Sequence, residues 1–80
     1  MHYVYVIQSL NNPEEKYIGL TENIKKRLYD HNSGSSSHTR KYRPWKIVAC
    51  IGVEKRETAA KLEKYMKSGS GRAFVKKRLF

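Results

Sequence analysis

Glu63 is the residue whose chemistry fits least well with a purely structural role. A helix is predicted over residues 56–67, and Glu63 lies between Ala59 and Met66 on its apolar stripe, so its side chain points inward. Burying an unpaired carboxylate is costly. The structural interpretation is a residue at the border of the apolar stripe, or one that forms a buried ion pair with Arg27 or a lysine. The functional interpretation is a carboxylate that binds a metal ion at the floor of a cleft.

Two tyrosines on neighbouring predicted strands form a second candidate group. Residues 3–8 and 16–20 are rich in β-branched and aromatic side chains and flank a turn, which predicts a β-hairpin. If paired residues have numbers with an even sum, Tyr5 and Tyr17 share a face and lie nearly opposite each other. Packing alone explains many strand tyrosines. Gly19, however, indicates close approach of a ligand or another backbone.

The predicted helix after the hairpin supplies a third pair. We expect Thr21 as its N-cap and Gly34 as its stop, with the helix running to about residue 31 or 32. Arg27 and His31 are four residues apart at the edge of its apolar stripe. Arginine keeps its charge and suits a phosphate, whereas histidine exchanges a proton near neutral pH. Each alone is typical of a solvated helix, but beside the tyrosines they predict a phosphate-binding and proton-transfer cluster.

The remaining elements predict how these residues are positioned. Residues 45–53 read as a third strand whose alternate residues from Trp45 onward share one face, with Trp45 packed in the core. A short helix over residues 70–77 is expected to pack Phe74 and Val75 after the helix that carries Glu63. The order ββαβαα predicts an α/β (α+β) fold, a three-stranded, mostly antiparallel sheet flanked by helices.

The charge of the chain narrows its partners. Residues 1–80 suffice for one domain, and 17 Lys and Arg against 7 Asp and Glu give a formal net charge of +10. A polyanion is therefore expected, nucleic acid first and an anionic membrane surface second. Neither a membrane-spanning run nor a signal peptide is recognisable. The single cysteine excludes an internal disulfide and predicts a reducing, cytoplasmic compartment.

In combination these residues resemble the GIY-YIG nuclease family. Tyr3-Val4-Tyr5 is similar to the first tripeptide of the family name, in which glycine and isoleucine usually precede the tyrosine, and Tyr17-Ile18-Gly19 matches the second. Arg27 and His31 follow at the spacing of the family's helix, and Glu63 falls where the family keeps its metal-binding glutamate. The resemblance covers nearly the whole chain. It is strongest to the small stand-alone bacterial form, which is similar to the N-terminal nuclease part of the excision-repair C subunit.

This resemblance implies a metal-dependent endonuclease that hydrolyses DNA phosphodiester bonds with weak sequence or structure selectivity, in repair or recombination. Glu63 would hold a single Mg²⁺ or Mn²⁺ ion, and Arg27 would bind the scissile phosphate. Either Tyr5 or Tyr17 would take the proton from water, and His31 would relay that proton or position the tyrosine. Both tyrosines stay open as the base.

DNA binding is expected to depend on the cationic surface, with branched, nicked or single-stranded DNA as the partner. Nothing in the sequence indicates a protein partner or a membrane. Leu20 stands where some family members carry a lysine, which Lys26 or Lys67 would have to replace. The predicted DNA-binding residues are His38, Arg40, Lys41, Arg43, Lys46, Lys67, Arg72 and Lys76. The alternative function is a non-catalytic nucleic-acid-binding module, which would have no need of a carboxylate facing its polyanionic ligand.

Overall fold

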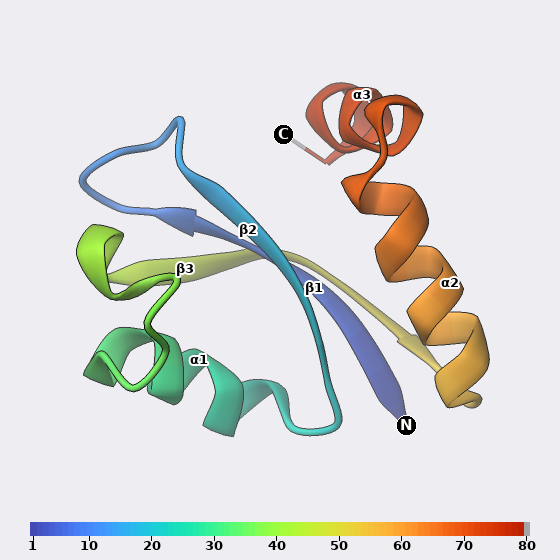
Figure 1. Cartoon of the computed structure of the whole chain (residues 1–80), viewed down its shortest axis with the longest axis horizontal. Helices are drawn as coiled ribbons and strands as arrows, with labels where there is room; N and C mark the ends of the chain where they lie inside the picture. The colour runs from blue at the N-terminus through green and yellow to red at the C-terminus, as the bar shows by residue number, and fades with distance from the viewer. Residues whose placement is uncertain (80) are drawn as a thin grey trace.

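A computed structural model describes residues 1–79. In it the chain folds into a three-stranded antiparallel sheet with helices on both faces (Figure 1). The strand order is β2-β1-β3. The elements are β1 (His2–Ser9), β2 (Lys16–Thr21), α1 (Ile24–Ser33), the 3₁₀-helix η1 (Arg40–Tyr42), β3 (Trp45–Val53), α2 (Arg56–Lys67) and α3 (Gly69–Arg78). The predicted α+β class and the order ββαβαα are confirmed.

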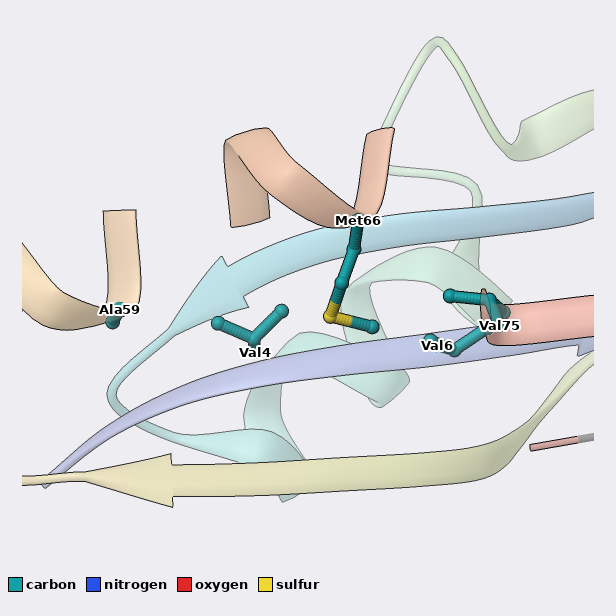
Figure 2. Close-up of a cluster of buried hydrophobic side chains, with 5 residues drawn as sticks. All are labelled: Val4, Val6, Ala59, Met66 and Val75. Atoms are coloured by element: carbon teal, nitrogen blue, oxygen red, sulfur yellow. The ribbon is translucent and has the colours of Figure 1, made fainter. Parts of the chain in front are cut away.

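The central strand β1 separates two apolar clusters because its side chains alternate between the faces of the sheet. Val4 and Val6 pack against α2 and α3, and Figure 2 shows the side chain of Met66 reaching from α2 toward β1 between them. Tyr5 and Ile7 point to the opposite face, which α1 covers. The site residues on β1 and α1 therefore share one layer of the domain.

β3 does not keep one face, contrary to the alternation expected from its sequence. Val6 pairs with Ala49, whereas Ile7 pairs with Ile47, so β3 carries one additional residue, a β-bulge. Trp45 and Ile47 consequently pack on the α1 side, and the inward residues from Ala49 onward pack on the α2 side. Trp45 is only 4% exposed, which confirms its predicted place in the core.

The boundaries of α1 differ from the prediction at one end. Asn23, not Thr21, is the N-cap, and its side chain accepts a hydrogen bond from the backbone N–H of Lys26 at 3.0 Å. Thr21 instead ends β2, where it pairs with Tyr3. Gly34 ends the helix as predicted, with a left-handed φ of 87° that glycine adopts without steric cost.

The C-terminal helices confirm all but one of the expected core contacts. Ala59 and Met66 are buried on α2, and Val75 is buried on α3. Phe74 was expected in the core but is 41% exposed, because α3 turns the face that carries Val75 toward the sheet. Among residues 1–79, no helix has the length and apolar character needed to cross a membrane.

Candidate active site

The hairpin of β1 and β2 places both predicted tyrosines on the α1 side of the sheet. The register pairs Tyr5 with Gly19 and Ile7 with Tyr17, so the tyrosines share a face, as predicted. They are diagonal neighbours rather than directly opposite, with ring centroids 6.4 Å apart. β2 is an edge strand, and Tyr17 therefore lies at the border of the sheet.

Gly19 marks a close approach, and the group that approaches is the ring of Tyr5. A β-carbon on Gly19 would lie 2.8 Å from Cε1 of Tyr5 and nearer still to its hydroxyl oxygen, which real β-carbons essentially never do. The missing side chain thus lets the Tyr5 hydroxyl pass over the backbone of β2. The ligand or backbone contact expected at Gly19 is replaced by this aromatic contact.

Gly19→Ala is expected to destabilise the fold by about 1–3 kcal/mol, because the new methyl group would push the Tyr5 ring out of a filled site. Urea unfolding monitored by circular dichroism measures this loss. Gly69→Ala is the matched control, since nothing lies within 4 Å of a β-carbon there. Equal stability of the Gly19→Ala and Gly69→Ala proteins would show that Tyr5 does not need the space.

His31 lies at the centre of the site. We expected it at the edge of the apolar stripe of the helix, but it is fully buried, at 0% exposure. Its Nε2 atom is 2.8 Å from the Tyr5 hydroxyl, and its Nδ1 atom is 2.6 Å from the hydroxyl of Thr39. In a neutral imidazole one nitrogen donates and the other accepts, and a threonine hydroxyl can complement either arrangement. The three side chains therefore form a continuous buried hydrogen-bonded series, and the Tyr17 ring centroid lies 5.1 Å from that of His31.

Thr39 is a site residue that the sequence did not single out. It is 1% exposed, and its carbonyl oxygen accepts a hydrogen bond from the indole N–H of Trp45 at 2.8 Å. Asn32 bonds in both directions with the Trp45 backbone and so joins the end of α1 to the start of β3. These bonds fix the 33–44 segment over His31. No local spacing marks Thr39, because its partners come from distant parts of the chain.

Arg27 supplies a permanent positive charge on the exposed side of the cluster. Burial raises the pKa of Tyr5, and hydrogen bonding and the charge of Arg27 oppose that rise only in part. Burial also lowers the pKa of His31 to about 4, and repulsion from Arg27 acts in the same direction. At neutral pH the site thus holds a neutral phenol and a neutral imidazole beside a guanidinium.

Glu63 approaches the tyrosines from α2, around the edge strand. Its carboxylate pairs with Lys67 at 3.3 Å and its side chain is 25% exposed. The Lys67 ammonium in turn lies 5.9 Å from the centroid of the Tyr17 ring. The charge of Glu63 also contributes to raising the pKa of Tyr5, after burial. Glu63 is therefore a partly exposed, lysine-paired carboxylate at the border of the cluster.

The donor set fits a hydrated Mg²⁺ or Mn²⁺ ion rather than a metal enclosed by protein. Among residues 1–79 there is no group of three or more His, Cys, Asp and Glu side chains close enough to surround a metal. Mg²⁺ often takes one carboxylate and fills its other positions with water and phosphate oxygens. The partial exposure of Glu63 leaves room for those ligands.

The predicted DNA-binding residues fall into two separate groups. One follows α1 on the surface and comprises His38, Arg40, Lys41, Arg43 and Lys46, all exposed. The other lies beside Tyr17 and comprises Lys67, Arg72 and Lys76. Of the two lysines considered as replacements at Leu20, Lys26 pairs with Asp30 at 3.4 Å on the exposed face of α1, whereas Lys67 lies next to Tyr17.

Two bacterial proteins are similar to this chain over most of its length. A UPF0213 protein of Syntrophus aciditrophicus is 38% identical over 68 residues, which are 75% of this chain and 76% of that protein. The solution NMR structure of a UPF0213 protein from Bacillus halodurans aligns with a TM-score of 0.56 and 27% identity, covering 98% of this chain and 85% of that one.

A second kind of relative is named for an activity. A structure-specific endonuclease subunit SLX1 homologue of Giardia intestinalis is 36% identical over 53 residues, which are 62% of this chain but only 15% of that protein. The GIY-YIG catalytic domain model matches residues 1–78. The paired tyrosines, the helix carrying Arg27 and His31, and the glutamate of α2 thus lie within a match that spans nearly the whole sequence, and the chain belongs to the GIY-YIG nuclease family.

Proposed function

We propose that this protein is a metal-dependent endonuclease that hydrolyses phosphodiester bonds in branched, nicked or single-stranded DNA during repair or recombination. The observation that carries the proposal is the buried hydrogen bond between Tyr5 and His31, placed beside the guanidinium of Arg27 and the carboxylate of Glu63. The name of the SLX1 relatives, structure-specific endonuclease subunit, supports DNA as the substrate.

The charged residues divide the work of hydrolysis. Negative charge builds on the phosphate oxygens as water attacks in line. Arg27 would bind the scissile phosphate and stabilise that charge, because a guanidinium offers several donors in a fixed plane. A Mg²⁺ or Mn²⁺ ion held by Glu63 would supply Lewis-acid polarisation of the phosphate. Lys67, paired with Glu63, would add a second positive charge near Tyr17.

Tyr5 is the stronger of the two tyrosines as the group that accepts the proton from water. Its hydroxyl is hydrogen-bonded to Nε2 of His31 at 2.8 Å. Tyr5 can therefore accept a proton from water as it passes its own hydroxyl proton to His31. His31 is neutral above about pH 4 and is able to accept it. Tyr17 interacts with Tyr5 and His31 through its ring, with the Lys67 ammonium, and with the Arg27 guanidinium through a hydrogen bond and its charge. Neither cation can accept a proton from Tyr17, which suits a positioning role.

The test is incubation with splayed-arm, nicked and single-stranded DNA in Mg²⁺ or Mn²⁺, with chelator as the control. We expect cleavage only with the metal, and we expect Tyr5→Phe to cleave about 100-fold more slowly or worse, the usual contribution of a general base. DNA binding without cleavage in every condition would overturn the nuclease proposal and favour the non-catalytic binding module. Cleavage that persists in chelator would remove the metal from the mechanism.

A further inference from the structure

A cavity of about 450 Å³ lies between the β1–β2 hairpin and the α2–α3 pair, and Tyr17 and Lys67 belong to both this cavity and the candidate active site. The volume lies within the range of small-molecule sites, about 300–1,000 Å³. A DNA strand whose scissile phosphate lies at Arg27 and Glu63 would therefore have a neighbouring nucleotide at the mouth of the cavity. This inference rests on the proposed function.

One wall of the cavity is basic. Arg72 and Lys76 are four residues apart on α3, so both project from the same face of the helix, and both are exposed. Lys67 of α2 continues this wall toward the active site. A planar guanidinium and two ammonium groups that line one cavity suit the phosphates of a polynucleotide backbone.

The facing wall carries the carboxylates of Glu14 and Glu15 and the ammonium of Lys16, so it keeps a net negative charge. Glu14 and Glu15 lie in the β1–β2 loop, and the backbone N–H of Glu15 donates to the carbonyl of Asn12 at 2.8 Å, which holds the loop in place. A duplex carries phosphates on both strands, and one of its strands would meet this acidic wall. A single strand can place its phosphates against α3 and its base toward the carboxylates, which accept hydrogen bonds from exocyclic amino groups.

The floor between the walls is apolar. Val6, Ile18 and Val75 line it, but Val6 and Val75 are only 0% and 4% exposed, so Ile18 and Tyr17 supply its accessible part. Bases removed from a duplex stack on aromatic rings and cover apolar surface, and each such contact contributes about 1–3 kcal/mol. A paired base within a duplex keeps its faces stacked on its neighbours and has no comparable use for this floor.

We propose that the cavity binds one unpaired nucleotide next to the scissile phosphate, so that the protein selects sites where a single strand leaves a duplex. The basic wall holds the phosphate of this nucleotide, Ile18 and Tyr17 contact its base and sugar, and the carboxylates of the facing wall repel a second strand. The cavity thus determines substrate structure rather than sequence.

The test compares two double variants of α3 that remove equal charge. Arg72→Ala/Lys76→Ala alters the cavity, whereas Lys77→Ala/Arg78→Ala alters α3 residues that do not line it. Binding is measured by fluorescence anisotropy in chelator, using a splayed-arm DNA and a fully paired duplex of equal length. We expect the cavity variant to lose about tenfold in affinity for the splayed-arm DNA, because two charge-assisted contacts to the phosphate of the unpaired nucleotide are lost. Its loss on the duplex should equal the small loss that the control variant shows on both DNAs.

Equal losses by the two double variants, or equal losses on the two DNAs, would overturn the cavity proposal. Glu14→Gln/Glu15→Gln provides a second measurement, and we expect it to raise affinity for the duplex more than for the splayed-arm DNA. All the substituted groups lie on helix or loop surfaces, and thermal unfolding verifies that each variant folds. Because binding is read without metal, an absence of cleavage would contradict the nuclease function and leave this binding pattern as a separate result.

Discussion

Glu63→Gln is expected to reduce DNA cleavage by at least about 100-fold, with DNA binding unchanged or tighter. A metal ion contributes several kcal/mol to stabilising the charge of the transition state, and each 1.36 kcal/mol is tenfold in rate. The amide keeps the shape of the side chain but is a poor ligand for Mg²⁺. The substitution also removes one negative charge near the polyanion. It releases Lys67, whose ammonium pairs with the Glu63 carboxylate at 3.3 Å in the unsubstituted protein.

Glu57→Gln is the matched control for this prediction. Glu57 lies on the same helix, is exposed, and loses the same charge when changed to glutamine. Initial rates on nicked or splayed-arm DNA across a Mg²⁺ series separate the two variants, and anisotropy gives their binding. A Glu63→Gln protein that cleaves as fast as the Glu57→Gln protein, with the same dependence on Mg²⁺, would mean that Glu63 is only the partner of Lys67.

Acidification is expected to lower the free energy of unfolding through His31. Burial and the charge of Arg27 lower its pKa in the folded protein to about 4, whereas an unfolded histidine has a pKa of 6.5. Between these values the unfolded chain binds the proton and the folded chain does not, so this contribution is complete above pH 6.5 and is lost as the pH falls to about 4. The shift corresponds to roughly 3 kcal/mol.

Urea unfolding at pH 7, 5.5 and 4.5 measures this dependence, and NMR titration of the imidazole protons measures the pKa of His31 directly. The carboxylates add their own pH dependence, which a His31→Gln protein retains, so the difference between the two proteins isolates His31. His38→Gln removes an exposed histidine of the following loop and should leave the pH dependence unchanged. A His31 resonance that titrates near pH 6.5 in the folded protein would contradict the buried hydrogen-bonded placement.

The pH dependence of cleavage tests whether His31 is the group that accepts the proton from Tyr5. In the proposed mechanism His31 accepts a proton from Tyr5 only while His31 is neutral, so we expect cleavage to fall toward about pH 4 together with stability. Two variants of Thr39 test the other hydrogen bond of His31, which joins Nδ1 to the Thr39 hydroxyl at 2.6 Å. Thr39→Ser keeps the hydroxyl, whereas Thr39→Val keeps the shape of the side chain and removes the hydroxyl. The serine protein should therefore retain cleavage better than the valine protein.

Most of the elements could be predicted from the sequence because the relevant signals are local. The strands of the hairpin, the third strand over Trp45–Val53 and the helix over Arg56–Lys67 each carry their own hydrophobic period. The even-sum pairing also placed Tyr5 and Tyr17 on one face. The helix start at Asn23 was missed because Thr21 is also a favourable cap residue in isolation, and its pairing with Tyr3 keeps it in the strand.

The features that escaped prediction depend on contacts between distant segments. The bulge in β3 is defined by its register against β1, where Ile7 meets Ile47 and Val6 meets Ala49, and no residue type within β3 marks it. Thr39 joins the site only because the segment after α1 folds back over His31. The burial of His31 follows from the same contact. Sequence patterns give the face of a helix residue, but a covering loop decides whether that residue meets water.

The split of the site between the two layers of the domain has a consequence for when the protein can act. Tyr5 and His31 lie between the sheet and α1, whereas Glu63 comes from α2 on the other side. A fragment with only the hairpin and α1 would contain Arg27 but not Glu63. A fragment with only α2 would contain Glu63 but not Arg27. Under the proposed mechanism, a chain that is nascent, nicked or partly unfolded would therefore not cleave DNA, and cleavage would require the whole domain to be folded.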